Sequence, residues 1–218
     1  MSNSYILVTA GNTQMPIDRV RCLTNIFSGR TGARIAREAA LRGHRVMLFT
    51  SHPEVVESHP AIEVLTYRTF DELSELMARY IPGSGFDVIV HTAAVSDYAL
   101  AGVFATGDDQ TLHDVSAGKV KSHHEDLWLN LVPTPKLVDL IRHPWGFRGK
   151  LVKFKLEVGM NETELRDVAE RSRQQSQADF MVANTLEGKE EWALLGPISG
   201  DYVKLERAEL PARLLELL

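Results

Sequence analysis

The stretch TAGNTQMPIDRVRCLTNIFSGRTG, residues 9–32, decides the fold of this chain. It follows the apolar run YILV, and the early Gly11 and the final segment SGRTG are typical of a strand that turns into a phosphate-binding helix. A turn of this kind normally needs about six residues, but a long polar loop separates the two glycine-containing segments here. The sequence therefore predicts a strand, then a ligand-holding loop, then a helix.

Beyond this stretch, apolar runs alternate with amphipathic segments. Strands are predicted at YILVTA (5–10), HRVMLFTS (44–51), AIEVLTY (61–67) and FDVIVHTAAV (86–95). Helices are predicted at GARIAREAALRG (32–43) and at TFDELSELMARYI (69–81), where Thr69 is the expected N-cap. Such alternation is typical of parallel sheets with right-handed crossovers. We therefore expect an α/β fold, a Rossmann-like doubly wound and mostly parallel sheet with ligands at the carboxyl ends of its strands.

The second half resumes this alternation after a polar interruption. Residues 96–130 lack a steady period, so we expect an irregular lid or active-site loop region there. The elements expected after it are strands at 127–132, 150–158 and 178–188, helices at 133–142, 161–177 and 210–218, and a small antiparallel ribbon formed by 192–196 and 202–206. Asn161 and Glu164 have the spacing of a capping box. The whole chain, 1–218, is expected to form a single domain.

Composition favours a cytoplasmic protein with no membrane association. Hydrophobic residues make up 44% and charged residues 24% of the chain, and no apolar run approaches the roughly 18 residues that span a bilayer. The chain start lacks the features of a secretory leader, and the single Cys22 cannot form an internal disulfide. For Cys22, a packed or bystander thiol is favoured over a nucleophile.

Positive charge is concentrated in the first quarter of the chain. Residues 1–50 contain seven arginines against Asp18 and Glu38, which gives +5 there although the whole chain carries −5. Such a segment can attract an anion. A nucleic-acid partner is disfavoured because the chain is acidic overall and aromatic residues do not interleave with the arginines. For Arg37, Arg42 and Arg45, a solvated helix face is the preferred interpretation.

The long first loop and five later segments resemble phosphopantothenoylcysteine synthetase, the ligase of coenzyme A biosynthesis. In the loop, the resemblance is carried by Thr9, Gly11, Thr13, Pro16, Ile17, Asp18, Val20, Arg21, Asn25, Ser28, Gly29 and Gly32. The later segments are AAVSDY (93–98), GKVK (118–121), LVPTPKLV (131–138), FKLEV (154–158) and QADFMVAN (177–184), in the family's order. Six segments in order, covering nearly the whole chain, are a specific signal.

This resemblance implies a two-step ligation. The carboxylate of 4′-phosphopantothenate would attack the α-phosphate of CTP, or of ATP, and form an acyl nucleotidylate and pyrophosphate. The amine of cysteine would then displace the nucleotide. Mg²⁺ would accompany the triphosphate, held largely by phosphates and water rather than by a metal site of the protein. The family also forms homodimers, and a separate phosphopantothenoylcysteine decarboxylase is expected to act on the product.

The resemblance assigns roles to individual residues. Asn25 would handle the acyl intermediate, because an uncharged amide can grip a carbonyl as it becomes tetrahedral, and Lys119 would reach the triphosphate and take part in catalysis. The substrate-binding residues would be Gly11, Thr13, Asp18, Arg21, Ser28 and Gly29. The nucleotide-binding residues would be Ala93, Ala94, Asp97, Lys119, Pro135, Lys136, Leu137, Val138, Phe154 and Arg171.

Each assignment has a plainer alternative. Without the family, Asn25 would be interpreted as a turn cap, Arg21 as a surface charge and Asp97 as a helix cap. Lys119 would be a solvated loop lysine, while Ala93, Ala94 and Phe154 would be ordinary core residues.

The sequence also departs from the family's pattern. Met15 stands where glutamate is usual, and Phe27-Ser28-Gly29 replaces Ser-Ser-Gly. Many bacterial members carry two lysines on the helix after the F-x-x-E strand, but the segment VAERSRQQSQ contains none, so Arg171 or Arg173 is the expected substitute. The run from Phe154 into this helix is also about four residues longer than the commoner form.

Other functional classes are weighed against the ligase. A catalytically altered homologue that binds nucleotide or pantothenoyl ligands as a sensor or subunit is the main alternative. A short-chain dehydrogenase is disfavoured because each tyrosine lacks a lysine four residues later, and FTSHPE offers no ribose-binding carboxylate directly after the second strand. Adjacent histidines in a polar loop, such as His123 and His124, are usually solvated, so a metal site is not predicted.

Overall fold

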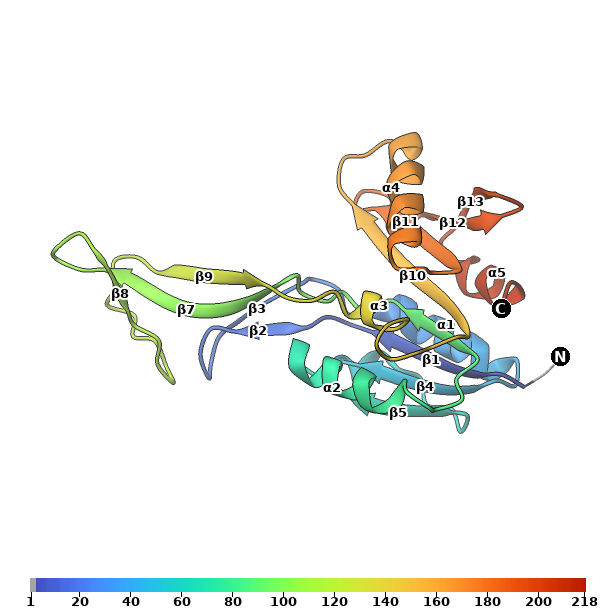
Figure 1. Cartoon of the computed structure of the whole chain (residues 1–218), viewed down its shortest axis with the longest axis horizontal. Helices are drawn as coiled ribbons and strands as arrows, with labels where there is room; N and C mark the ends of the chain where they lie inside the picture. The colour runs from blue at the N-terminus through green and yellow to red at the C-terminus, as the bar shows by residue number, and fades with distance from the viewer. Residues whose placement is uncertain (1–2) are drawn as a thin grey trace.

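A buried, mostly parallel sheet of eight strands forms the centre of the molecule (Figure 1). The computed structural model describes residues 3–218. The parallel strands are β1 (Tyr5–Ala10), β4 (Arg45–Thr50), β5 (Ile62–Thr66), β6 (Val88–His91), β10 (Lys150–Glu157) and β11 (Phe180–Thr185). Two antiparallel strands, β12 (Trp192–Ile198) and β13 (Asp201–Glu206), complete the order β13-β12-β11-β10-β6-β1-β4-β5. The prediction of a doubly wound sheet with a C-terminal ribbon is confirmed.

The strand order reverses next to β1. From β1 the chain runs through β4 to β5 on one side, then returns to β6 on the other side and continues to β10 and β11. Ligands of open α/β sheets bind at such a switch point, beyond the carboxyl ends of the strands. The topology alone therefore places the candidate site near the ends of β1 and β6.

Helices cover both faces of the sheet. They are α1 (Arg30–Leu41), α2 (Phe70–Tyr80), α3 (Leu137–Leu140), α4 (Glu162–Gln175) and α5 (Leu210–Glu216), with a short 3₁₀ turn at Pro53–Val55. Ile6 and Val8 of β1 pack in the same apolar cluster as α1 and α5, whereas Leu7 packs with α2 and α3 on the opposite face. Because side chains alternate along a strand, one strand supplies both cores.

The predicted helix starts are confirmed for α2 and α4. Thr69 accepts a hydrogen bond from the Glu72 backbone N–H and the Glu72 side chain returns one, which forms a capping box. Asn161 and Glu164 form the second capping box. The first helix begins at Arg30, two residues before the predicted start, and Gly29 stands at its N-cap position in a left-handed conformation without a side-chain cap.

The segment predicted to be an irregular loop forms a β-structured arm. Strands β7 (Tyr98–Thr106), β8 (Leu112–Asp114) and β9 (Trp128–Pro133) make an antiparallel sheet that projects from the main body (Figure 1). The hairpin of β2 (Gln14–Pro16) and β3 (Cys22–Thr24) extends along the same side. The prediction of irregular structure over 96–130 was wrong for β7 and β8, because β7 mixes exposed and buried positions without a two-residue period and β8 has only three residues. The strand predicted at 127–132 corresponds to β9.

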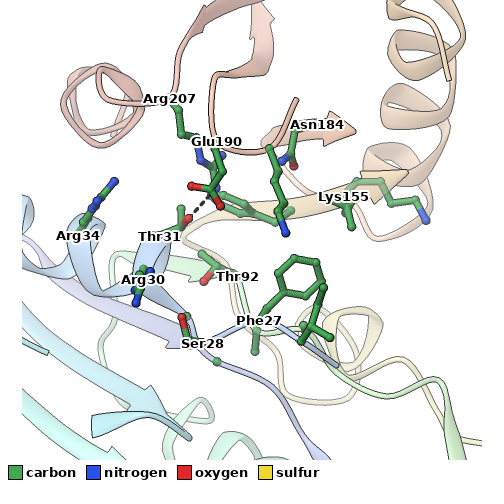
Figure 2. Close-up of a pocket in the computed structure, with 18 residues that line it drawn as sticks. Phe27, Ser28, Arg30, Thr31, Arg34, Thr92, Lys155, Asn184, Glu190 and Arg207 are labelled. Carbon is green, nitrogen blue, oxygen red and sulfur yellow. Dashed lines mark hydrogen bonds between the residues drawn. The ribbon is translucent and has the colours of Figure 1, made fainter. Parts of the chain in front are cut away.

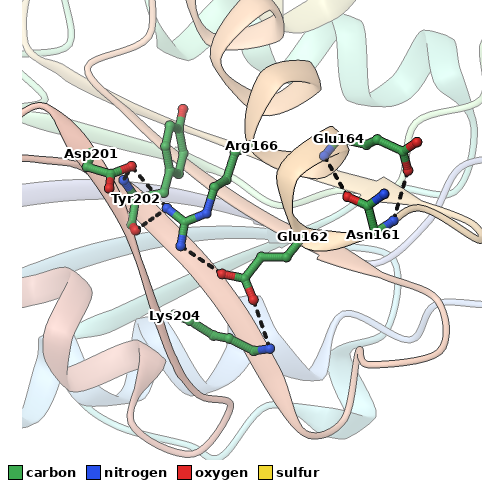
Figure 3. Close-up of polar contacts among 7 residues, drawn as sticks. All are labelled: Asn161, Glu162, Glu164, Arg166, Asp201, Tyr202 and Lys204. Carbon is green, nitrogen blue, oxygen red and sulfur yellow. Dashed lines mark hydrogen bonds and ion pairs between the residues drawn. The ribbon is translucent and has the colours of Figure 1, made fainter.

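A surface network joins the start of α4 to β13 (Figure 3). The Arg166 guanidinium lies 2.8 Å from Glu162 and 3.0 Å from Asp201, and it also donates to the Tyr202 carbonyl. The Lys204 ammonium lies 3.0 Å from the other oxygen of Glu162. Pairs as exposed as these contribute little individually, so the network fixes the angle of the ribbon more than it stabilises the fold.

Within residues 3–218 the structure contains no helix that combines the length and the apolar character needed to traverse a bilayer.

Candidate active site

A cavity of about 370 Å³ lies beyond the carboxyl ends of β1, β6, β10 and β11 (Figure 2). Segments from both ends of the chain contribute to its wall. The lining residues are Gly11, Ile26, Phe27, Ser28, Gly29, Arg30, Thr31, Arg34, Thr92, Ala93, Ala94, Phe154, Lys155, Leu156, Asn184, Lys189, Glu190 and Arg207. The cavity therefore occupies the position that the strand order indicates.

Two glycines let the first strand and the first helix approach closely at the cavity. Gly29 has φ +77, and a Cβ atom built there would lie 2.3 Å from the backbone nitrogen of Gly11. A Cβ on Gly32 would lie 2.6 Å from both Ala10 Cβ and Thr92 Oγ1. No larger residue fits these places without movement of the backbone, so glycine is required by the turn and by the packing.

Asn25 is not among the lining residues of the cavity but adjoins two of them, because Ile26 follows it in the chain and its side chain reaches Ala94. Its Nδ2 donates to the Ala94 carbonyl at 3.0 Å, and its own carbonyl accepts from Asn12 Nδ2. Asn12 is held in turn by Ser51, whose hydroxyl lies 3.2 Å from Asn12 Oδ1. Asn25 is exposed, and no described residue hydrogen-bonds to its Oδ1. The amide is thus anchored through one of its two N–H groups, while the second N–H and Oδ1 make no hydrogen bond to a described residue, beside the lining residues Ile26 and Ala94.

Asp18 and Arg21 lie on the β2–β3 hairpin and are not among the lining residues. The Arg21 guanidinium lies 2.6 Å from the Asp18 carboxylate and donates to the Val120 carbonyl at 2.7 Å. Asp18 also accepts from the backbone of Val20, Arg21 and Val120. The hydrogen bond from Arg21, helped by the backbone donors, holds the pKa of the Asp18 carboxyl well below its ordinary value. In this chain the two residues fasten the hairpin to the arm, and their substrate-binding role stays a prediction.

The other predicted substrate residues are placed differently. Gly11, Ser28 and Gly29 line the cavity. Thr13 is buried, and its hydroxyl accepts from the Ser96 backbone N–H at 2.8 Å, where the arm leaves the main sheet.

The predicted nucleotide residues are only partly gathered. Ala93, Ala94 and Phe154 line the cavity. Asp97 is exposed and lies 3.9 Å from the ammonium of Lys136. Pro135 precedes α3, whereas Leu137 and Val138 belong to α3 and are buried in the core. Their contact with nucleotide stays a prediction.

Lys119 and Arg171 are exposed, and neither lines the cavity. Lys119 lies in the arm, between β8 and β9, and Arg171 lies on α4. Arg173, the other candidate substitute for the family's lysines, is engaged by Glu170 at 2.7 Å. Their roles toward a triphosphate also stay predictions.

Several cavity residues were not predicted. Thr92 and Asn184 lie at the ends of β6 and β11, so the rule that strand ends meet ligands could have found them. Arg30 and Arg34 belong to the arginine-rich first quarter and follow the predicted phosphate turn. Lys155 and Leu156 lie in the segment FKLEV, and Ile26, Phe27 and Thr31 lie in the first loop or directly after it, so these residues could have been found from the quoted segments. Lys189, Glu190 and Arg207 carry no motif, and only the folded structure brings them to the cavity.

Cationic side chains dominate the charge of the cavity wall. Five lining residues carry positive charge and one, Glu190, carries negative charge; the cationic ones are Arg30, Arg34, Lys155, Lys189 and Arg207. A concave site with this excess concentrates anions such as phosphates. Among residues 3–218 no group of three or more histidine, cysteine, aspartate or glutamate side chains could hold a metal ion. Cys22 is exposed on β3, so of the two interpretations favoured for it the packed one is wrong.

Two groups of hydrogen-bonded polar side chains lie on the neighbouring strands β6 and β10, where His91 and Lys153 are in register. Thr9 Oγ1 lies 2.8 Å from His91 Nδ1. The Lys153 ammonium, on the neighbouring strand, donates to Ser176 Oγ at 2.5 Å, and this hydroxyl donates to Asp139 at 2.5 Å. Burial lowers the pKa of His91 to about 4, and the charge of Lys153 acts in the same direction. His91 is therefore neutral in the folded protein at pH 7.

This buried histidine predicts a loss of stability in mild acid. Since the pKa of His91 is lower in the folded chain than the ordinary value near 6.5, the unfolded state binds the proton more tightly, and stability falls as pH drops from about 6.5 toward 4. Linkage gives a loss of about 2 kcal/mol between pH 7 and pH 5. Urea unfolding at the two pH values should show it.

His91→Gln should reduce this pH dependence, whereas His123→Gln, at an exposed position in the arm, should leave it unchanged. An equal pH dependence in the wild type and in His91→Gln would contradict the assignment.

Comparisons with known proteins agree on one family. A sequence model described as DNA/pantothenate metabolism flavoprotein C-terminal domain matches residues 1–194. The coenzyme A biosynthesis bifunctional protein CoaBC of Thermococcus kodakarensis is 38% identical over 198 residues, which cover 88% of this chain and 44% of that protein. CoaBC of Escherichia coli is 26% identical over 179 residues, covering 82% and 40%. The chain spans less than half the length of these two relatives.

Solved structures share the fold. The crystal structure of the DNA/pantothenate metabolism flavoprotein from Streptococcus pneumoniae is similar with a TM-score of 0.85 at 27% identity, covering 98% of this chain and 97% of that one. A mutant of Cab2 in complex with phosphopantothenate-cysteine has a TM-score of 0.73 at 18% identity, covering 98% and 86%. At that identity, the second likeness shows the fold alone.

Proposed function

Because this chain belongs to the DNA/pantothenate metabolism flavoprotein C-terminal domain family, we propose that it joins 4′-phosphopantothenate and L-cysteine through an acyl nucleotidylate, with CTP as the first-choice co-substrate. The observation that supports the proposal most strongly is the cationic cavity at the switch point, with the amide of Asn25 beside two of its lining residues. In the first step, a carboxylate oxygen bonds to the α-phosphorus and pyrophosphate leaves. In the second, the amine of cysteine bonds to the acyl carbon, and the nucleoside monophosphate leaves.

The residues present suit this chemistry because it needs little covalent help. Two anions must be held together and the developing charge neutralised, and the cationic wall supplies that charge. Asn25 would steady the acyl group as its carbonyl carbon becomes tetrahedral, through the Nδ2 N–H that is not used by the hydrogen bond to the Ala94 carbonyl. Mg²⁺ would enter with the triphosphate and draw most of its ligands from phosphate oxygens and water.

Pyrophosphate release tests the proposal. The protein mixed with 4′-phosphopantothenate, cysteine, Mg²⁺ and CTP should release pyrophosphate and form phosphopantothenoylcysteine in equal amounts, with ATP as the competing nucleotide. Omitting cysteine should leave the acyl nucleotidylate detectable by mass spectrometry. No pyrophosphate with either nucleotide would sink the ligase proposal.

A non-catalytic binding role is the second candidate. It is favoured by one observation: Arg171 and Arg173, the substitutes expected for the family's lysines on α4, do not line the cavity. Such a protein would bind a nucleotide or a pantothenoyl compound, and be stabilised by it against heat, without releasing pyrophosphate. The assay above therefore separates the two candidates.

A homodimer is proposed on the basis of the arm. The arm exposes large apolar side chains, including Tyr98, Leu112, Trp128 and Val132, which are 42–56% exposed. Apolar surface of this kind on a projecting sheet is suited to a second copy of the chain. Sedimentation equilibrium should give twice the mass of one chain, and the mass of a single chain at micromolar concentration would contradict this. The ligation product would serve a separate phosphopantothenoylcysteine decarboxylase.

A further inference from the structure

Arg207 reaches the cavity from the C-terminal end of the fold (Figure 2). It follows β13 directly, and its backbone N–H donates to the Glu191 carbonyl at 2.8 Å, which fixes it beside the loop after β11. Its Nη2 donates to Thr31 Oγ1, in the first turn of α1, at 2.6 Å. The residue lies thirteen positions beyond the last residue that the family's sequence model matches, residue 194.

The second terminal nitrogen of this guanidinium has no partner. Among residues 3–218, Arg207 Nη1 is the buried side-chain nitrogen or oxygen that makes no hydrogen bond. Burial lowers the pKa of Arg207, the charge of Arg34 lowers it further, and Glu190 partly offsets both. A guanidinium stays protonated in proteins, so Arg207 carries a positive charge with an N–H donor that has no partner. This arrangement is unfavourable unless a bound anion accepts a hydrogen bond from Nη1.

Other unengaged cations lie on the same wall. The Arg34 side chain makes no hydrogen bond or ion pair with any residue in 3–218, and the Lys189 ammonium lies over the ring of Phe27, with Nζ 5.2 Å from its centroid. Glu190 is the one carboxylate that lines the cavity. A phosphate monoester carries about two negative charges and a triphosphate about four. The excess of positive charge on the cavity wall therefore matches a triphosphate better than a single phosphate.

We infer that Arg207 is a phosphate-binding residue, whose free Nη1 acts with Arg34 and Lys189 to hold the terminal phosphates of a polyphosphate ligand. Thr31 accepts from Nη2 and so holds the guanidinium at the wall of the cavity that Arg207 lines. That the polyphosphate belongs to a nucleoside triphosphate rests on the proposed function. In that case Arg207 grips the group that leaves as pyrophosphate.

Calorimetric binding of inorganic tripolyphosphate tests the inference. Arg207→Gln removes the positive charge and the paired N–H donors of the guanidinium. The affinity for tripolyphosphate should fall about 10- to 100-fold, as expected for loss of a charge-assisted hydrogen bond. Arg207→Lys keeps the charge and should recover part of the loss. Arg213→Gln, on the exposed face of α5 where Arg213 pairs with Glu216, is the matched control and should bind as the wild type does.

Thermal unfolding separates a ligand role from a structural one. If Arg207 serves a ligand, Arg207→Gln should unfold without ligand at a temperature no lower than the wild type, because an unpaired buried charge is removed. The upward shift produced by tripolyphosphate should shrink in this variant. A lower unfolding temperature together with unchanged tripolyphosphate affinity would overturn the inference and leave Arg207 as a structural link to Thr31.

Two further results distinguish the inference from the proposed function. If binding of 4′-phosphopantothenate weakens in Arg207→Gln while binding of tripolyphosphate does not, the site holds the monoester and the polyphosphate assignment is wrong. If tripolyphosphate binding depends on Arg207 but no pyrophosphate is released with CTP or ATP, the inference holds and the ligase proposal fails.

Discussion

Substituting aspartate for Asn25 is expected to slow conversion of the acyl nucleotidylate into product by about 10²- to 10³-fold, the effect of losing one preorganised donor at a tetrahedral centre. The change removes Nδ2, which donates to the Ala94 carbonyl at 3.0 Å, and puts a carboxylate beside that oxygen. It also places negative charge where the acyl oxygen becomes negative. Single-turnover product formation, with the intermediate followed by mass spectrometry, measures the effect.

Asn161→Asp is the matched control for this substitution. Asn161 is the N-cap of α4, where aspartate caps as well as asparagine does, and it lies outside the cavity. It should leave turnover and unfolding temperature close to wild type. Normal turnover by Asn25→Asp would remove Asn25 from the mechanism, whereas its unfolding in the absence of substrate would show that the amide serves the fold.

Gly29→Ala is expected to lower the free energy of unfolding by about 3 kcal/mol or more, through backbone strain and overpacking together. The φ of +77 disfavours any residue with a side chain, and the added Cβ would meet Gly11 N at 2.3 Å and Gly11 Cα at 2.8 Å. Both obstacles are backbone atoms, so no flexible side chain can move aside. Urea unfolding measures the change, and ligand binding should weaken with it.

Gly43→Ala is the control that separates the cost of a positive φ from the cost of a steric clash. Gly43 has φ +89, but a Cβ built there has no other atom within 4 Å. Its substitution should therefore cost only about 1–2 kcal/mol, the penalty of a left-handed conformation. Equal losses in the two variants would show that the close approach of Gly29 to Gly11 adds nothing.

The sequence was sufficient for the elements whose signal is local. Strands such as β1 and β4 are short buried runs, and the capping boxes at Thr69 and Asn161 mark helix starts by residue type and spacing. The turn around Gly11 and Gly29 could be predicted because a positive φ favours glycine whatever the neighbouring residues are. These features depend on residues near one another in the chain.

Most of the arm and the far wall of the cavity could not be predicted for the opposite reason. Strand β7 mixes exposed positions such as Tyr98 with buried ones such as Val103, so no regular period marks it. Arg207 is an ordinary charged residue in an ordinary context until β13 returns it to α1. Likewise Asp18 and Arg21, read as ligand contacts, meet Val120 through a long-range contact that no local pattern encodes.

The contact between Thr31 and Arg207 joins residues 176 positions apart. During synthesis, β1, the glycine turn and Asn25 emerge first, while the residues that line the other side of the cavity, such as Arg207, have not yet been made. A half-made chain therefore presents Arg30 and Arg34 without Lys155, Lys189 and Arg207, the cations that the second half of the chain brings to the cavity. Polyphosphate would bind more tightly to molecules in which β13 has packed against the sheet. Ligand binding would therefore stabilise the completely folded chain over a partly folded one.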